Sequence, residues 1–167
     1  MLKRFYPDNI ADSAYKINYK ELYERGIRGL LFDIDNTLVE HGADANPKAV
    51  QFINQLRKMG FQVCLISNNK KERVDRFNKD IQAFSIYDAR KPSGKNYKRA
   101  MRLMKTDINN TVFIGDQLFT DVYGAKRLGM TNYFVKPIGK KEEIQIVIKR
   151  YLERIVLHFY RKDQRKK

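Results

Sequence analysis

Short apolar runs alternate with amphipathic helical patterns along most of the chain. Runs of this length, rich in β-branched and aromatic residues, predict buried strands. They place five strands at residues 27–34, 61–66, 84–87, 111–114 and 131–135. Because a helical pattern follows each strand, the alternation favours an α/β fold, a Rossmann-like three-layer sandwich with a five-stranded, mainly parallel sheet.

Signals for helix ends support this order of elements. Asn46 and Pro47 predict a helix start, since Asn caps the first turn and Pro fits the first helical position. Gly60 ends that helix. Three further helices are predicted at residues 70–80, 95–104 and 121–128.

The last segment, at about 140–161, is predicted to be a basic amphipathic helix. Its apolar residues include Ile144, Ile148 and Leu152, and they cover more than one core-facing stripe. Two interpretations stay open. The helix docks on its own domain, or its wide apolar face and basic flanks bind an anionic membrane surface.

Charge is the unusual bulk property of this chain. The 167 residues, enough for one domain spanning 1–167, carry 34 Lys and Arg against 19 Asp and Glu, a formal net charge of +15. Such an excess favours nucleic acid, anionic lipid or phosphorylated substrates as partners, although solubility alone would also explain it.

The single cysteine, Cys64, lies in an apolar run and is expected to be a buried structural thiol. It excludes an intrachain disulfide and a metal site built on paired cysteines. No apolar run approaches the roughly 20 residues that span a bilayer, and the N-terminus lacks a signal-peptide pattern. We therefore expect a cytoplasmic protein, soluble or peripheral on the inner face of the membrane.

The sharpest local motif is Asp33-Ile34-Asp35-Asn36-Thr37-Leu38, at the carboxyl end of the first strand. Residues i and i+2 of a strand point to the same side, so both carboxylates are expected to face one site. Two adjacent carboxylates repel each other unless a cation lies between them, and hard oxygen ligands suit Mg²⁺. A surface turn would explain the motif equally well.

Polar residues follow the second and third strands as well. Ser67 and Asn68 can hold a phosphate at a helix start, or can simply cap that helix. Lys91 precedes Pro92, which keeps residue 91 extended, and its ammonium can neutralise phosphate charge. In a chain this rich in lysine, one such residue is weak support.

The fourth strand ends in a glycine and two acids. Gly115 permits a tight exit, Asp116 is a candidate metal ligand, and Asp121 follows five residues later. The alternative is an ordinary loop Asp followed by one at a helix start. Because the carboxyl ends of parallel strands meet at one edge of a sheet, all these residues are expected to gather there.

An acidic pair, a serine, a lysine and a second acidic pair, each after a successive strand, resemble the haloacid dehalogenase (HAD) superfamily over residues 27–135. The resemblance implies that Asp33 attacks phosphorus and forms an aspartyl-phosphate. It implies that Asp35 protonates the leaving alcohol, activates water and binds the metal through its carbonyl. Asp33 and Asp116 would bind Mg²⁺ directly, and Asp121 would support the metal shell or Lys91.

The same resemblance assigns residues to the phosphate. Thr37, Ser67 and the backbone N–H groups of Asn36 and Asn68 would bind the phosphoryl oxygens. Lys91 would balance the charge of the transition state. Cap domains of this superfamily are inserted after the first motif or between the second and third, and residues 38–61 and 67–91 are too short to hold one. An uncapped, open site suits large substrates.

Within the superfamily the chain is most similar to the YqeG-type members of subfamily IIIA. The similarity lies in GIRGLLFDIDNTLVE, SNN, ARKP and GDQLFTDVYGAKRLGM. It implies a phosphatidylglycerophosphate phosphatase that yields phosphatidylglycerol, with an anionic phospholipid at the membrane surface as its partner. Candidate membrane contacts are residues 2–6, which otherwise form a strand or loop on the domain, and the C-terminal helix.

Alternatives to the lipid substrate stay open. The same basic surface would suit a soluble phosphatase for a phosphoprotein or a nucleic-acid end. A module that binds RNA or ribosomes is a third possibility, although no RNA-binding aromatic motif is visible. His41, in the loop after the first motif, is either a substrate contact or a solvated loop residue.

Overall fold

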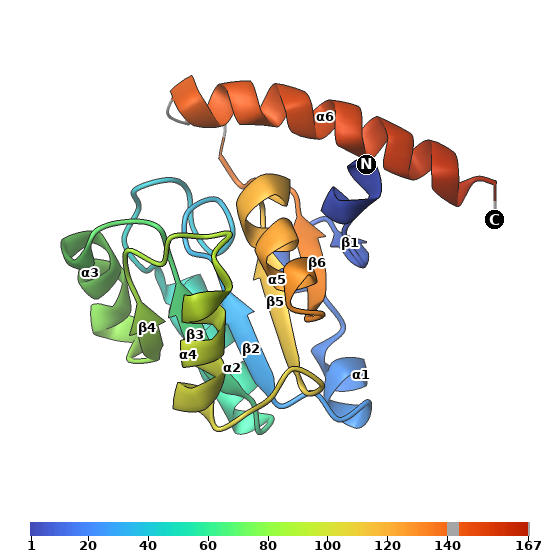
Figure 1. Ribbon diagram of the computed structural model, residues 1–167. Coiled ribbons are helices and arrows are strands. Elements are labelled where there is room, and N and C mark those ends of the chain that lie inside the picture. Colours follow the sequence, from blue (N-terminus) through green and yellow to red (C-terminus); the bar gives the residue numbers. More distant parts are fainter. Residues whose placement is uncertain (140–143, 167) are drawn as a thin grey trace.

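Six parallel strands form one sheet in the computed structural model, which describes residues 1–139 and 144–166. The strands are β1 (Asn9–Ala11), β2 (Gly29–Phe32), β3 (Gln62–Ile66), β4 (Phe84–Ile86), β5 (Thr111–Gly115) and β6 (Thr131–Val135). Their order across the sheet is β1-β6-β5-β2-β3-β4 (Figure 1).

The five predicted strands and the α/β class are confirmed, and a sixth strand corrects the predicted number. The extra strand, β1, pairs with β6 at the edge, with Asn9 opposite Tyr133. Sequence pattern missed it because three residues, Asn-Ile-Ala, are too short to show periodicity. The first predicted strand is also shorter than expected, since regular pairing stops at Phe32.

Helices connect the strands and cover both faces of the sheet (Figure 1). The α-helices are α1 (Tyr19–Glu24), α2 (Pro47–Lys58), α3 (Lys71–Ile81), α4 (Gly94–Met104), α5 (Tyr123–Arg127) and α6 (Ile144–Gln164). Short turns of helix are η1 (Leu2–Phe5), η2 (Ala14–Lys16) and η3 (Leu118–Val122). The Asn46 side chain accepts a hydrogen bond from the Ala49 amide, so the predicted cap of α2 is confirmed.

Two helix predictions need correction. The helix expected at 121–128 begins earlier, as the π-helical turn η3, and becomes α-helical only from Tyr123. The C-terminal helix continues to Gln164, three residues beyond the predicted end. Its expected start at 140 lies outside the described residues.

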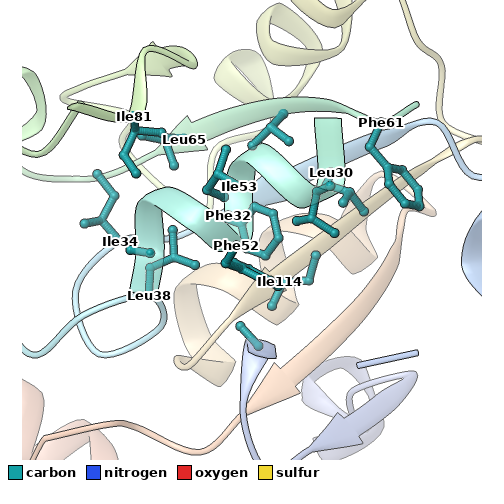
Figure 2. Packing of buried hydrophobic residues seen from close by; sticks show 14 of the residues in the cluster. Leu30, Phe32, Ile34, Leu38, Phe52, Ile53, Phe61, Leu65, Ile81 and Ile114 are labelled. Carbon is teal, nitrogen blue, oxygen red and sulfur yellow. The ribbon is translucent and has the colours of Figure 1, made fainter. Parts of the chain in front are cut away.

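Alternate strand residues enter opposite cores, as a three-layer sandwich requires. Leu30 and Phe32 of β2 pack with Phe52 and Ile53 of α2 on one face (Figure 2). Leu31, between them, packs on the other face in a second cluster that includes Cys64, Tyr97 and Phe113. Cys64 is fully buried, as expected, and burial raises the pKa of its thiol to about 12.

Strand order creates a switch point beside β2. The chain runs from β2 outward to β3 and β4, then returns to place β5 and β6 on the other side of β2. At such a reversal the loops after two neighbouring strands diverge and leave a crevice at their carboxyl ends. Asp33 follows β2 and Asp116 follows β5, so both lie at this crevice.

The C-terminal helix crosses the end of the molecule above α5 and β6 (Figure 1). A third cluster holds it there: Val156 of α6 packs with Leu118, Val122 and Phe134. Residues 2–5 form helix η1, and Phe5 contacts Phe119 with ring centroids 5.0 Å apart. The N-terminal segment is therefore a short helix packed on the domain, whereas the alternative to a membrane contact was a strand or a loop there.

Much of α6 remains uncovered. Seven apolar residues of this helix are exposed: Ile144, Val147, Ile148, Tyr151, Leu152, Ile155 and Phe159. Among the described residues no helix combines the length and the apolar character needed to cross a membrane.

Candidate active site

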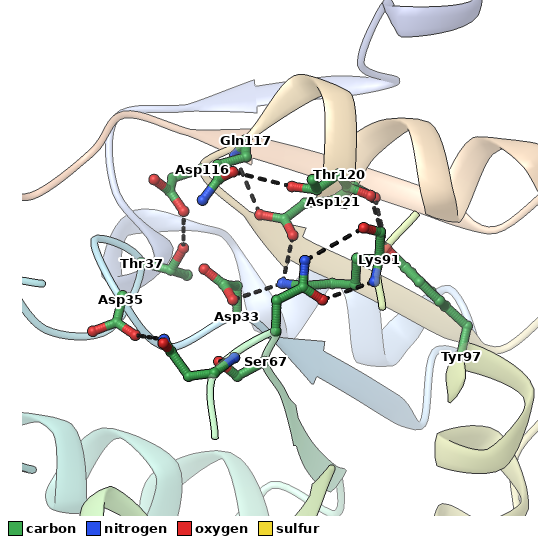
Figure 3. Close-up of polar contacts among 12 residues, drawn as sticks. Asp33, Asp35, Thr37, Ser67, Lys91, Tyr97, Asp116, Gln117, Thr120 and Asp121 are labelled. Carbon is green, nitrogen blue, oxygen red and sulfur yellow. Dashed lines mark hydrogen bonds and ion pairs between the residues drawn. The ribbon is translucent and has the colours of Figure 1, made fainter. Parts of the chain in front are cut away.

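A buried lysine joins two carboxylates at the switch point. The Lys91 ammonium donates hydrogen bonds to Asp33 Oδ1 and to Asp121 Oδ1, each at 2.7 Å (Figure 3). The side chains of all three residues are at most 7% exposed. The peptide between Lys91 and Pro92 is cis, a feature that the sequence pattern did not indicate.

Three acids gather around this lysine. Carboxylate oxygens of Asp33, Asp116 and Asp121 all lie within 4.8 Å of one another. Gly115 makes this approach possible, because a Cβ at that position would overlap the Asp121 carboxylate. The second oxygen of Asp121 accepts a hydrogen bond from the Gln117 amide at 3.2 Å, which fixes its orientation.

The donor set fits Mg²⁺. Three buried carboxylates offer hard oxygen atoms, and they come from the segments that follow two adjacent strands. Two cations, Lys91 and Arg150, contact the cluster, so that these groups carry one net negative charge when all three acids are ionised. A divalent cation would reverse that sign and prepare the site for a phosphate dianion.

Burial shapes the protonation of the cluster. It raises the pKa of Asp33 well above the ordinary value, and the charges of Asp121 and Asp116 add to the effect while Lys91 opposes it. Burial likewise raises the pKa of Asp116, against the opposing charge of Arg150. Burial alone would lower the pKa of Lys91, but Asp121 and Asp33 outweigh it and the net shift is upward. The lysine therefore stays charged at neutral pH.

Asp35 has partners of its own. Its Oδ1 accepts hydrogen bonds from the Gly42 amide at 2.7 Å and from Arg73 Nη2 at 2.9 Å, and its Oδ2 accepts one from Asn69 Nδ2 at 2.6 Å. The expected alternation of two carboxylates along a strand is wrong, because β2 ends at Phe32 before either acid. Asp35 belongs instead to the following loop, where it bridges to Val39.

The predicted phosphate-binding residues lie around the same crevice. Thr37 donates from Oγ1 to Asp116 Oδ1 at 3.1 Å, and the buried Ser67 accepts at Oγ from the Asn69 amide at 3.1 Å. Asn68 binds the backbone of Lys91: its Oδ1 accepts from the Lys91 amide at 2.7 Å. Asn68 thus fixes the position of Lys91, a role that the sequence did not indicate.

One predicted donor is engaged within its own loop. Asn36 has a left-handed backbone, with φ of 61°, and its amide donates to the Val39 carbonyl at 2.7 Å. The Asn36 side chain accepts from the Gly139 amide at 3.2 Å. His41, half-buried in the same loop, is not part of the acidic cluster.

Two charged residues of α6 reach the site and were missed as site residues. Arg150 contacts both the carboxylate and the carbonyl of Asp116, and Glu153 Oε2 accepts from Arg150 Nη1 at 3.0 Å. Glu153 Oε1 also accepts from the Leu118 amide at 2.7 Å, at the start of η3. The one usable signal was an acid three residues after an arginine on a helix in which basic residues outnumber acidic ones.

Arg73 of α3 is the third missed residue. Besides binding Asp35, it carries two buried nitrogens, Nε and Nη1, that make no hydrogen bond among the described residues. Buried donors without partners are uncommon in folded proteins. The Asp35 side of the crevice therefore has two hydrogen-bond donors that are available to a ligand.

Comparison with known proteins places these residues in a family. The family described as haloacid dehalogenase-like hydrolase matches residues 39–129, which include Ser67, Lys91, Asp116 and Asp121. The chain is 36% identical over 159 residues to "Probable phosphatase YqeG" of Bacillus subtilis (strain 168), covering 94% of this chain and 92% of that protein.

The chain is also similar to more distant proteins. The glyceraldehyde 3-phosphate phosphatase of Pyrococcus furiosus is 24% identical over 119 residues, covering 66% of this chain and 49% of that protein. A HAD phosphatase from Thermococcus onnurineus superposes with a TM-score of 0.50 at 24% identity, covering 59% and 50% of the two chains. An uncharacterized protein from Listeria monocytogenes serotype 4b superposes with a TM-score of 0.55 at 13% identity, covering 71% and 86%.

Proposed function

The chain belongs to the haloacid dehalogenase-like hydrolases, and from that premise we propose that it dephosphorylates phosphatidylglycerophosphate through an aspartyl-phosphate at Asp33. At the coarser level it is a HAD-type phosphatase. The observation that carries the proposal is the Lys91 ammonium bound to Asp33 inside a cluster of three acids. A carboxylate held beside a fixed cation at a ligand-binding crevice is placed to attack a phosphate group.

The proposed reaction has two displacements at phosphorus. In the first, an oxygen of Asp33 forms a bond to phosphorus, the ester P–O bond breaks, and the leaving alkoxide takes a proton from Asp35. In the second, Asp35 takes a proton from water, whose oxygen attacks phosphorus and breaks the bond to Asp33. The products are the alcohol and inorganic phosphate, and both carboxyl groups regain their starting protonation.

Fixed charges around Asp33 support both displacements. Lys91 would offset charge that develops on the phosphoryl oxygens, and Thr37, Ser67 and the Asn68 amide are the proposed hydrogen-bond donors to them. Asp33, Asp116 and the Asp35 carbonyl are the proposed Mg²⁺ ligands, with Asp121 in support. When bound, Mg²⁺ would supply a Lewis acid that neutralises phosphate charge.

Three features support a lipid rather than a small metabolite. Residues 38–61 contain only a loop and α2, and residues 67–91 only α3 and β4, so no cap covers the crevice. The net charge of +15 suits an anionic surface, where each basic residue contributes about 1 kcal/mol. The outer side of α6 is both apolar and exposed, as in helices that lie in a membrane interface. Our proposal thus includes membership of the YqeG-type group of subfamily IIIA and action on the inner face of the membrane.

A second candidate is a phosphatase for a nucleic-acid end or a phosphoprotein. It is favoured by a second basic surface away from α6, a groove that includes Lys95, Lys98, Arg102 and Arg127. The acidic cluster is needed by either phosphatase and has no place in a module that only binds RNA. Both candidates share the chemistry at Asp33 and differ in the surface that holds the substrate.

The experiment compares substrates under one set of conditions. Phosphate release is measured with Mg²⁺ from phosphatidylglycerophosphate in mixed micelles, from phosphopeptides, from 3′- and 5′-phosphorylated oligonucleotides, and from p-nitrophenyl phosphate. We expect the lipid to give the highest kcat/KM and EDTA to abolish release. If the lipid is no better than the other substrates, the lipid proposal fails while the phosphatase stands.

The nucleophile is tested in the same assay with Asp33→Asn. Its matched control is Asp80→Asn, which changes an exposed acid of α3. We expect Asp33→Asn to lose at least 10³-fold in kcat on every substrate and the control to match wild type. Comparable rates for Asp33→Asn and wild type would reject Asp33 as the nucleophile.

A further inference from the structure

A groove of about 660 Å³ runs beneath α6, between this helix and the ends of β1 and β6. Its walls are largely apolar and include Ile10 of β1, Phe134 of β6, and Val147 and Leu157 of α6. Basic residues stand among these apolar walls: Lys136, Arg150, Arg154 and Arg161. The groove therefore offers apolar surface and positive charge together, and no step of the proposed reaction uses it.

The groove adjoins the active site through one residue. Arg150 lines the groove and also contacts the Asp116 carboxylate in the acidic cluster. Glu153 lines the groove as well, and it binds the amide of Leu118, two residues after Asp116. The groove and the acidic cluster therefore share Arg150 and lie next to each other.

Two of the basic residues are available to an anion. Arg154 and Arg161 are exposed and form no ion pair within the described part of the chain. By contrast, Lys136 pairs with Asp12 at 2.5 Å, and Arg150 pairs with Asp116 and Glu153. The unpaired positive charges of the groove thus lie on α6, at Arg154 and Arg161, which follow Arg150 along the helix.

We propose that this groove binds the phosphodiester and the first acyl carbons of an anionic glycerophospholipid, with the phosphodiester on Arg154 and Arg161. The inference rests on the proposed lipid substrate and adds a site that holds the part of the molecule that does not react. Apolar walls beside unpaired guanidinium groups complement an amphiphile with a negative headgroup. The exposed apolar side of α6 is continuous with the groove and would keep the lipid in contact with its bilayer.

Other occupants fit less well. A second copy of the chain would bring another +15 charges to a surface that is already basic. A nucleic-acid strand would use the arginines but would leave Ile10, Phe134 and Val147 without apolar partners. One phospholipid molecule uses both kinds of surface.

The test measures binding without turnover. Dihexanoyl phosphatidylglycerol, a soluble analogue of the product, is titrated calorimetrically into the full chain below its critical micelle concentration. Dihexanoyl phosphatidylcholine and glycerol 3-phosphate are titrated in parallel. We expect saturable binding of the anionic lipid that is at least fivefold tighter than binding of either comparison compound.

Adjacent residues of α6 provide matched variants. Val147 lines the groove and Ile148 does not, and both are exposed, so Val147→Glu and Ile148→Glu make the same change inside and outside it. We expect Val147→Glu to weaken lipid binding at least fivefold and Ile148→Glu to leave it within twofold of wild type. Equal binding by these two variants, or no lipid binding by wild type, would overturn the groove assignment.

Two double variants, each lacking two positive charges, complete the test. Arg154→Ala with Arg161→Ala removes the proposed phosphodiester contacts, and Lys98→Ala with Arg102→Ala removes two exposed cations of α4 outside the groove. Only the first pair is expected to weaken binding. Because the binding measurement needs no hydrolysis, it can reject the groove assignment even when the protein is an active phosphatase. Absence of lipid hydrolysis, in turn, does not decide whether the groove binds lipid. Circular dichroism melts of each variant exclude unfolding as the cause.

Discussion

The guanidinium of Arg150 contacts the carboxylate of Asp116 across 34 positions of sequence, and it thereby joins α6 to the acidic cluster. This contact places a positive charge on a proposed metal ligand. A cation so close to a metal ligand opposes metal binding by charge repulsion, and the effect is strong where water is largely excluded. We therefore expect Arg150 to raise the Mg²⁺ concentration that the site needs.

Arg150→Gln should lower the half-saturating Mg²⁺ concentration by roughly five- to tenfold, because about 1 kcal/mol of competition is removed. Mg²⁺ titrations followed by thermal unfolding and by phosphate release measure the change independently. Lys149→Gln, at the adjacent exposed position, should respond to Mg²⁺ like wild type. A rise in half-saturating Mg²⁺ for Arg150→Gln would show that the arginine supports the metal rather than competing with it.

Lys91→Met removes the ammonium and keeps most of the side-chain volume. It should lower kcat at least 10²-fold, because a fixed cation beside the reacting oxygens is lost. It also leaves Asp33 and Asp121 buried without their counter-ion, at a cost of about 3–5 kcal/mol in the metal-free protein. Mg²⁺ should therefore raise the melting temperature of Lys91→Met more than that of wild type.

Phosphate-release assays and melts with and without Mg²⁺ test both parts of the Lys91 prediction. Lys98→Met, an exposed lysine of α4, is the control for the substitution itself. Retention of more than a tenth of wild-type kcat would contradict the role given to Lys91.

Substitutions of Asp116 and of Asp121 should affect Mg²⁺ affinity to different extents. One oxygen of Asp121 already accepts a hydrogen bond from Lys91, and the other accepts one from the Gln117 amide. Asp121 is therefore better placed to support the metal shell than to bind Mg²⁺ directly. Asp116→Asn should raise half-saturating Mg²⁺ at least tenfold. Asp121→Asn should raise it less than threefold while lowering kcat through Lys91. Calorimetric Mg²⁺ titrations decide the matter, and equal shifts for the two variants would reject this division of roles.

Sequence alone predicted the layers of the fold because strand and helix periodicities differ along most of the chain. It also identified Asp33, Lys91, Asp116 and Asp121, which the structure brings together, since the carboxyl ends of parallel strands share one edge. Those positions follow from connectivity and need no knowledge of side-chain packing.

What the sequence missed depends on packing between distant segments. Arg150 and Glu153 reach the site because Val156 docks α6 on Leu118 and Phe134, a contact with no local sequence pattern. The partners of Asp35 depend on the conformation of the loop after Phe32 and on Arg73 of the next helix. Loop conformation and helix docking are tertiary properties, so periodicity carries no signal for them.

Glu153 should make stability depend on pH. Burial raises the pKa of Glu153 from 4.5 to about 7, although Arg150 and the Leu118 amide oppose the shift. Between these values the folded chain holds a proton on Glu153 that the unfolded chain has lost. Because the folded state binds more protons, the free energy of unfolding falls as pH rises from 4.5 to about 7. The total decrease is about 3 kcal/mol at most, since each unit of pKa difference corresponds to about 1.4 kcal/mol.

Glu153→Gln keeps an oxygen that accepts from the Leu118 amide and removes the titration. The free energy of unfolding of this variant, minus that of wild type, should therefore increase from pH 5 to pH 7 and stay constant at higher pH. Urea unfolding at several pH values in EDTA measures the difference, with Glu72→Gln, an exposed acid of α3, as control. Stability curves for Glu153→Gln and wild type that stay parallel across this range would show that Glu153 is ionised in the fold. Arg150 would then hold it as a charged pair, and the link between α6 and the acidic cluster would not respond to pH in this range.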